Sequence, residues 1–270
     1  MAVILCDMDG VLYRGDHVVP GAPECIRELR HAGHRFFFIT NNSSRLREEY
    51  VAKLARMGIE ATVDEVLTST YVMAHWLRVH GRLPRQAYVI GSPAVVTELV
   101  RAGAGASRTY RRGTVDAVVC GIDVHFTYQK LANAQEAILA GAAFYGTNRD
   151  LMLPAEDRVY PGNGALLAAI EACTGRQAMV FGKPEPYLYT HALELAGANP
   201  ADALVVGDNL ATDIAAAKRC GLRSVLVLTG LASAAEVAAL PQDARPDYVV
   251  DDLPAMARQV LDLLMPAQTG

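Results

Sequence analysis

The stretch Val3-Ile4-Leu5-Cys6-Asp7-Met8-Asp9-Gly10 places four apolar residues directly before two acids and a glycine. An uninterrupted apolar run is typical of a strand that helices cover on both faces of a parallel sheet. Ligands of such sheets bind outside the carboxyl ends of the strands. Asp7 and Asp9 stand at that edge, on the same side of the extended chain. A solvated turn after a strand is the alternative interpretation.

Short apolar runs alternate with amphipathic stretches along almost the whole chain. This alternation is typical of βαβ units and predicts an α/β fold with a parallel sheet. The predicted strands are residues 3–6, 35–39, 87–90, 117–120, 143–145, 178–181, 203–206, 224–227 and 248–250. The predicted helices are residues 22–31, 44–57, 70–80, 93–102, 128–140, 165–173, 186–196, 211–219, 234–240 and 253–264.

Length and composition limit the class of protein. The chain has 270 residues, of which 51% are hydrophobic and 20% are charged, as in an ordinary globular protein. This length fits one or two domains. The formal net charge of −4 gives no electrostatic support for binding to nucleic acid or to a membrane surface. We therefore expect neither among the partners.

The cysteines and the hydropathy pattern indicate a cytoplasmic protein. The five cysteines are odd in number and scattered, and no two are spaced C-x-x-C, so neither a disulfide framework nor a zinc ribbon is expected. No charge-free stretch approaches the ~20 residues that span a bilayer. The N-terminus begins with a strand and lacks the basic and apolar regions of a signal peptide.

A second predicted strand also ends in acids. Residues 203–206 lead into Gly207-Asp208-Asn209, and Asp213 follows in the first turn of the next predicted helix. A carboxylate there also suits the helix dipole, so Asp213 alone has an ordinary explanation. Like charges at neighbouring strand ends raise one another's pKa unless a cation lies between them. Several oxygen ligands without His or Cys indicate a hard cation such as Mg²⁺.

Two further strand ends carry polar residues. Residues 35–39 lead into Thr40 and a run of small hydrogen-bonding side chains that either cap a helix or hold a phosphate oxygen. Residues 178–181 lead to Lys183, which is either an ordinary exposed lysine or a cation that neutralises a bound phosphate.

These strand ends together resemble a known family. The stretches concerned are Asp7-Met8-Asp9-Gly10-Val11-Leu12, Thr40-Asn41-Asn42, Gly182-Lys183-Pro184 and Gly207-Asp208-Asn209-Leu210-Ala211-Thr212-Asp213. In this order they resemble the four motifs of the haloacid dehalogenase superfamily. Similarity to cap segments of the NagD-like, or type IIA, phosphatases extends over Gly121-Ile122-Asp123, Tyr128-Gln129-Lys130-Leu131, Gly146-Thr147-Asn148-Arg149-Asp150 and Pro161-Gly162-Asn163-Gly164.

The resemblance implies a division of chemical roles. Asp7 would be the nucleophile that forms an aspartyl-phosphate, and Asp9 would be the general acid and base. Members with Thr at the second acidic position include ion-pumping ATPases, so Asp9 favours hydrolysis of a phosphate ester. Thr40 and Lys183 complete the implied catalytic set, which acts mainly by positioning and charge neutralisation.

The resemblance also implies a magnesium site and a substrate site. Mg²⁺ would be bound by the Asp7 carboxylate, the Asp9 backbone carbonyl and Asp208. Asn209 and Asp213 would lie behind these ligands, where Asp213 would orient water or Lys183. The substrate would be a small phosphorylated metabolite, and the implied contact residues are Thr40, Asn41, Asn42, Lys183, Asn148 and Leu153.

Motif spacing predicts an inserted cap. About 31 positions separate Asp9 from Thr40, but about 143 separate Thr40 from Lys183. The longer interval has room for a further α/β domain and resembles a type II cap. We therefore predict a Rossmann-like catalytic core at residues 1–80 and 178–270, with an α/β cap at residues 81–177.

The cap stretch 147–154 holds the candidate substrate selectors Asn148, Arg149 and Leu153, although ordinary cap packing explains them equally well. By the resemblance, Leu153 occupies a position that is His in the pyridoxal-phosphate phosphatase branch, where it contacts substrate. A leucine here makes that substrate less expected.

Two other classes of protein stay open at this point. A phosphorylation-dependent receiver domain also places acids, a Thr or Ser and a Lys at strand ends, but needs only about half this length. A non-catalytic family member acting as a binding module would normally lack one of Asp7, Asp9, Lys183 and Asp208, and all four are present. The oligomeric state is open as well, with a homodimer as one alternative.

Overall fold

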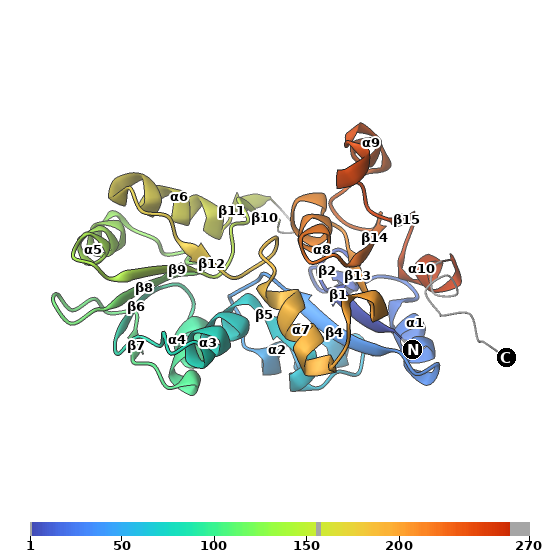
Figure 1. Cartoon of the computed structure of the whole chain (residues 1–270), viewed down its shortest axis with the longest axis horizontal. Helices are drawn as coiled ribbons and strands as arrows, with labels where there is room; N and C mark the ends of the chain where they lie inside the picture. Colours follow the sequence, from blue (N-terminus) through green and yellow to red (C-terminus); the bar gives the residue numbers. More distant parts are fainter. Residues whose placement is uncertain (1, 155–157, 260–270) are drawn as a thin grey trace. The chain divides into compact units, whose positions relative to one another are not determined.

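The computed structural model of the chain describes residues 2–154 and 158–259 (Figure 1). These residues form two compact units. Among the described residues, the first unit comprises 2–40, 48–67 and 183–259, and the second comprises 41–47, 68–154 and 158–182. The predicted cap, residues 81–177, falls within the second unit, which also includes residues 41–47, 68–80 and 178–182. The assignment of these units as catalytic core and cap stays a prediction.

The first unit is built on a six-stranded sheet. Its strand order is β15 (Tyr248–Val250), β14 (Arg223–Val227), β13 (Ala203–Gly207), β1 (Val3–Asp7), β4 (Arg35–Thr40) and β5 (Val66–Thr68). Strand β1 runs parallel to both of its neighbours, with Leu5 opposite Phe37 on β4 and Val205 on β13. Strands β1 and β13 are adjacent, so the acids that follow these strands meet at one edge.

Helices and short connections complete this unit. The helices are α1 (Ala22–His31), α2 (Arg47–Arg56), α7 (Tyr187–Ala196), α8 (Ala215–Arg219), α9 (Ala234–Ala239) and α10 (Leu253–Gln259). A hairpin of β2 (Tyr13–Arg14) and β3 (His17–Val18) follows the first acids. Alternate sheet residues such as Ile4, Phe36, Phe38, Leu204 and Val206 share one apolar core with residues of α1, α2 and α10. Burial on both faces explains the continuous apolar runs in the sequence.

The second unit has a five-stranded parallel sheet of its own. Its order is β12 (Met179–Val180), β9 (Ala143–Gly146), β8 (Ala117–Cys120), β6 (Ala87–Ile90) and β7 (Ala106–Ser107). Helices α3 (Ser69–Val79) and α4 (Pro93–Ala102) pack together, as do α5 (Tyr128–Leu139) and α6 (Asn163–Thr174), and Figure 1 shows the two pairs flanking this sheet. A hairpin of β10 (Met152–Pro154) and β11 (Val159–Pro161) contacts α6.

The α/β fold class with parallel sheets is confirmed, and each of the nine predicted strands corresponds to a strand. The short strands β2, β3, β5, β7, β10 and β11 were not predicted, because two or three residues carry too little hydrophobic periodicity. The described residues also contain three 3₁₀ turns, at Val63–Glu65, Pro200–Asp202 and Gln242–Ala244, and one π-helical turn, at Leu210–Ile214.

Two helix predictions needed correction at their starts. The helix predicted from residue 44 begins at Arg47, because the Asn42 side chain accepts hydrogen bonds from the Ser44 N–H and hydroxyl and holds the chain in a turn. The helix predicted at 211–219 is a π-helical turn, Leu210–Ile214, followed by α8. The predicted end of the last helix, residues 260–264, lies outside the described residues. No helix within the described part of the chain is long and apolar enough to cross a membrane.

The packing of the first unit predicts a large cost for truncating its central strands. Leu204 on β13 is fully buried, so Leu204→Ala should lower the free energy of unfolding by about 2–5 kcal/mol. Urea denaturation followed by circular dichroism measures this change. Leu195→Ala, at an exposed position of α7, is the matched control and should cost much less. Equal losses in the two variants would contradict this account of the core.

Candidate active site

Three of the predicted site residues lie at the carboxyl ends of adjacent strands in the first unit. Asp7 is the last residue of β1, Thr40 is the last residue of β4, and Asp208 directly follows β13. All three side chains are buried. The parallel register of β13, β1 and β4 therefore places two acids and a hydroxyl at one edge of the sheet.

Lys183 is a buried cation with two carboxylate partners. Its side chain is only 3% exposed, so the interpretation as an ordinary surface lysine is wrong. The Lys183 ammonium donates to Asp7 Oδ1 at 2.5 Å and to Asp213 Oδ1 at 2.7 Å. Hydrogen bonds of this charged kind are short and directional, so Lys183 fixes the orientation of the Asp7 carboxylate.

The protonation of this trio follows from its surroundings. Burial lowers the pKa of Lys183, but the two carboxylates outweigh that effect and hold the pKa well above its usual value. Burial raises the pKa of Asp7 well above its usual value, and Asp213 and Asp208 raise it further against the opposing Lys183. The ammonium therefore stays charged, while burial and the neighbouring acids favour protonation of Asp7, so that full ionisation of the acids needs a further cation.

The acids are grouped closely enough to bind a metal ion. Asp7, Asp208 and Asp213 each offer an oxygen, and these atoms lie within 4.8 Å of one another. Burial, followed by the charge of Asp213, raises the pKa of Asp208 to about 7. A carboxylate set without nitrogen or sulfur fits a hard cation such as Mg²⁺. The residues present therefore fit the predicted cofactor.

Two glycines leave the space that the Asp208 carboxylate occupies. Gly10 has φ of 85°, and a Cβ at this position would lie 2.2 Å from Asp208 Oδ2. A Cβ at Gly230 would lie 1.9 Å from the same oxygen, which also accepts a hydrogen bond from the Leu231 N–H at 2.8 Å. Residues 230 and 231 were not identified from the sequence. They follow strand β14, so the rule that identified the other strand ends also applies to them.

Asp9 differs from the buried acids because it is exposed. Partial burial of its carboxyl group raises the pKa, and the opposing charge of Lys53 keeps this increase smaller. A general acid works best when its pKa lies near the operating pH, and it must exchange protons with water. The position and the raised pKa of Asp9 suit that role.

Asp213 connects Lys183 to the first turn after β13. Its side chain is 1% exposed and accepts hydrogen bonds from Lys183, from the Tyr189 hydroxyl at 3.3 Å and from the Asn209 N–H at 3.3 Å. The Asn209 side chain accepts from the Ala211 N–H and begins the helical turn. Asp213 thus orients Lys183, and its predicted position behind the metal ligands stays a prediction. Tyr189, on α7, was not identified from the sequence.

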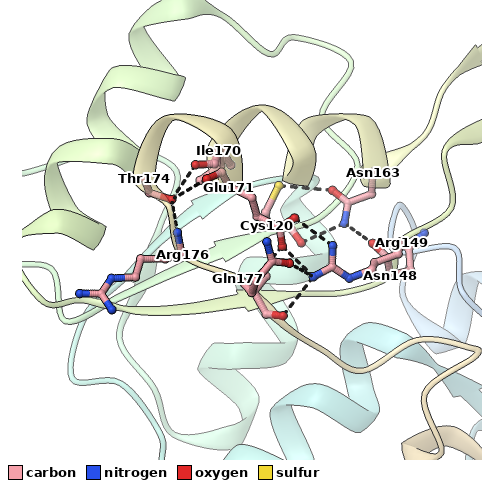
Figure 2. Close-up of polar contacts among 10 residues, drawn as sticks. Cys120, Asn148, Arg149, Asn163, Ile170, Glu171, Thr174, Arg176 and Gln177 are labelled. Carbon is pink, nitrogen blue, oxygen red and sulfur yellow. Dashed lines mark hydrogen bonds and ion pairs between the residues drawn. The ribbon is translucent and has the colours of Figure 1, made fainter.

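The remaining predicted contact residues lie in the second unit. Asn148 is buried, and Leu153 is half-buried on β10 opposite Tyr160. Figure 2 shows that Arg149 points to Glu171 on α6, with hydrogen bonds of 3.0 and 2.6 Å. This ion pair orients the Arg149 guanidinium toward α6 and supports a packing role, and a contact of Arg149 with substrate stays a prediction.

Asn41 and Asn42 also belong to the second unit, directly after Thr40. The Asn41 amide donates to Asp150 at 2.8 Å, and Asn42 forms the turn described above. The structure thus brings Asp7, Lys183, Asp208 and Asp213 into one cluster, with Thr40 and Asp9 at adjacent positions of the sheet edge. The contact of Asn41, Asn42, Asn148 and Leu153 with a substrate stays a prediction.

Comparison with known proteins agrees with this site. The sequence profile of haloacid dehalogenase-like hydrolases matches residues 4–105, and a second profile of HAD-like hydrolases matches residues 180–256. Human glycerol-3-phosphate phosphatase is 39% identical over 259 residues, which cover 87% of this chain and 81% of the relative.

Solved structures extend the comparison to the fold. The crystal structure of a glycerol phosphate phosphatase from Mycobacterium tuberculosis in complex with magnesium has a TM-score of 0.86 at 36% identity, covering 94% of this chain and 76% of the other. NagD from E. coli has a TM-score of 0.83 at 30% identity, covering 94% and 98%. The chain therefore belongs to the haloacid dehalogenase-like hydrolases. Within that family it is a NagD-like phosphoric monoester hydrolase, and the receiver and binding-module alternatives are not favoured.

The raised pKa of Asp208 predicts a pH effect on the metal-free protein. Between about pH 4 and pH 7 the unfolded chain loses this proton while the folded chain keeps it, so the free energy of unfolding should fall as pH rises. Asp7 acts in the same direction, so Asp208→Asn should reduce the fall without abolishing it. Urea titrations at pH 5, 6 and 7 in EDTA measure this slope. The exposed control Asp243→Asn should keep the full slope, and an unchanged slope in Asp208→Asn would contradict the prediction.

Proposed function

We propose that this chain is a Mg²⁺-dependent phosphatase that hydrolyses a small phosphate monoester through an aspartyl-phosphate. The observation that carries the proposal is the buried contact of Lys183 with both Asp7 and Asp213 beside Asp208. A structural ion pair needs one carboxylate for one ammonium. Three carboxylates around a single ammonium instead leave negative charge that suits a divalent cation and a phosphoryl group.

The first chemical step belongs to Asp7. A carboxylate oxygen of Asp7 attacks phosphorus, the new O–P bond forms, and the bond from phosphorus to the ester oxygen breaks. Lys183 holds Asp7 in position and supplies positive charge beside the transferring group. The Thr40 hydroxyl, at the end of the neighbouring strand β4, is placed to hold a phosphoryl oxygen.

Proton transfers belong to Asp9. In its protonated form it gives a proton to the leaving ester oxygen, which departs as an alcohol. The resulting carboxylate then takes a proton from the water that attacks phosphorus, so that phosphate is released and Asp7 is regenerated. Asp9 is thereby returned to its starting protonation state, and the cycle balances. Mg²⁺ bound by Asp7, Asp208 and the Asp9 backbone carbonyl would neutralise charge on the phosphoryl oxygens.

Substitution of the two acids tests these roles. Asp7→Asn should abolish turnover because the amide cannot form the aspartyl-phosphate, and Asp9→Asn should lower kcat by about 10²–10⁴-fold because proton transfer is lost. Mg²⁺-dependent release of p-nitrophenol from p-nitrophenyl phosphate measures both. Asp243→Asn is the exposed control and should retain wild-type turnover. Near-normal activity of either variant, with circular dichroism unchanged, would exclude the assigned role.

We further propose that the substrate is a small polyol phosphate such as glycerol 3-phosphate. The human and mycobacterial relatives, which are glycerol 3-phosphate phosphatases, support this proposal. The aliphatic side chain of Leu153 on β10 supports it as well, because it offers no hydrogen bond to a ring-bearing substrate. Neither nucleic acid nor a membrane is part of the proposed substrate, and the free cysteines of the described chain support a reducing, cytoplasmic compartment.

The substrate proposal predicts that Leu153→His changes which ester is preferred. An added imidazole can hydrogen-bond to or stack on a ring, so kcat/KM for an aromatic phosphate should rise about tenfold relative to glycerol 3-phosphate. The measurement is kcat/KM for an aromatic, a sugar and a glycerol phosphate in both proteins. Leu153→Met, which stays aliphatic, is the control. A uniform change across the three esters would show that Leu153 only packs the hairpin.

A further inference from the structure

A carboxylate in the second unit binds two amide side chains through a single oxygen. Asp150 Oδ2 accepts hydrogen bonds from Asn41 Nδ2 at 2.8 Å and from Asn148 Nδ2 at 2.5 Å. Asn148 and Asp150 belong to the loop of residues 147–150 that follows β9, whereas Asn41 comes from a segment 109 positions earlier. Asn41 directly follows Thr40, so this loop fixes the residue next to the proposed phosphate-binding hydroxyl.

Asn41 is held from two other directions as well. Its backbone carbonyl accepts a hydrogen bond from the Ser69 hydroxyl at 2.9 Å, at the start of α3. Gly182 lies close to the Asn41 side chain, because a Cβ on Gly182 would be 2.6 Å from Asn41 Oδ1 and 2.7 Å from the Thr147 carbonyl oxygen. Gly182 directly precedes Lys183. The 147–150 loop therefore lies against both chain segments that lead to proposed catalytic residues.

Helix α6 fixes this loop in turn. Figure 2 shows that Asn163, at the start of α6, donates to the Asn148 carbonyl oxygen at 2.8 Å. Two turns later, Glu171 pairs with Arg149 and also accepts a hydrogen bond from the Ala178 N–H. A loop held to one helix at two points is a rigid support for the residues that it contacts.

We propose that Asp150 is a positioning residue that acts through Asn41 on the Thr40–Asn41 backbone. The inference rests on the proposed phosphatase function. Direct contact of Asp150 with the substrate is disfavoured, because a carboxylate repels a phosphate group and because its Oδ2 already binds two amides. Its contribution is to fix Asn41, the residue bonded to Thr40, in one conformation.

The test compares three variants with matched chemistry. Asp150→Ala removes the acceptor and should lower kcat/KM by about tenfold or more, equally for p-nitrophenyl phosphate and glycerol 3-phosphate, because both esters share the phosphoryl group. The inhibition constant of inorganic phosphate should rise with it. Asp150→Asn keeps one oxygen that can accept from both amides, so its kcat/KM should stay within about threefold of wild type.

Asp116→Ala is the control for a general loss of packing. Asp116 is a carboxylate of the same unit that accepts hydrogen bonds from the Arg85 and Gln86 N–H groups. These hydrogen bonds involve neither Asn41 nor the 147–150 loop. Its removal should leave kcat/KM unchanged. Wild-type kcat/KM for Asp150→Ala, or equal impairment of Asp150→Asn and Asp150→Ala, would overturn the proposal.

A double-mutant cycle and hydrogen exchange complete the test. If Asp150 acts through Asn41, Asn41→Ala combined with Asp150→Ala should be no worse than Asn41→Ala alone, and additive losses would refute the proposal. Amide exchange in residues 41–47 should be faster in Asp150→Ala than in Asp116→Ala, and equal exchange would refute it too. Hydrogen exchange can be measured without turnover. If the wild-type protein were inactive, the phosphatase proposal would be rejected, and the exchange rates of residues 41–47 would still test whether Asp150 fixes Asn41.

Discussion

The ion pair of Lys183 with Asp7 and Asp213 is the interaction on which the rest of the site depends. A buried carboxylate without a partner would be protonated and could not act as a nucleophile. The shared ammonium keeps two acids close together and fixes their orientation. The two partners are far apart in sequence, since Lys183 lies 176 positions after Asp7. The whole second unit, residues 41–47 and 68–182, lies in that interval.

Most of this site was predictable because it follows from two regular patterns. Apolar runs such as residues 3–6 and 203–206 predict covered parallel strands, and adjacent parallel strands place their following residues at one edge. The acids Asp7 and Asp208 are therefore found together without knowledge of side-chain geometry. The same reasoning placed Asp213 in the first turn after β13, whereas its contact with Lys183 was implied by the family resemblance.

Other parts of the site were not predictable, because they depend on side chains that meet only in the folded chain. The Tyr189 hydroxyl reaches Asp213 from a helix whose apolar pattern gives no sign of it. Lys183 is buried because of its two partners, whereas its residue type alone suggests exposure. Asp150 is read from the sequence only as part of a cap motif, and its bond to Asn41 joins segments with no shared periodicity. The predicted start of α2 was wrong for a local reason, because the Asn42 side chain holds the chain in a turn.

The two glycines beside Asp208 also limit which acid the site accepts. Because a Cβ at Gly10 or at Gly230 would overlap Asp208 Oδ2, the backbone at both glycines lies directly against this carboxylate, and the longer side chain of a glutamate would have to displace it. The Leu231 N–H further holds the shorter side chain at a set distance from the backbone. The distance between the carboxylate of residue 208 and its own backbone is therefore restricted by neighbouring backbone on two sides. The surrounding fold, and not only the residue type, decides where this carboxylate lies.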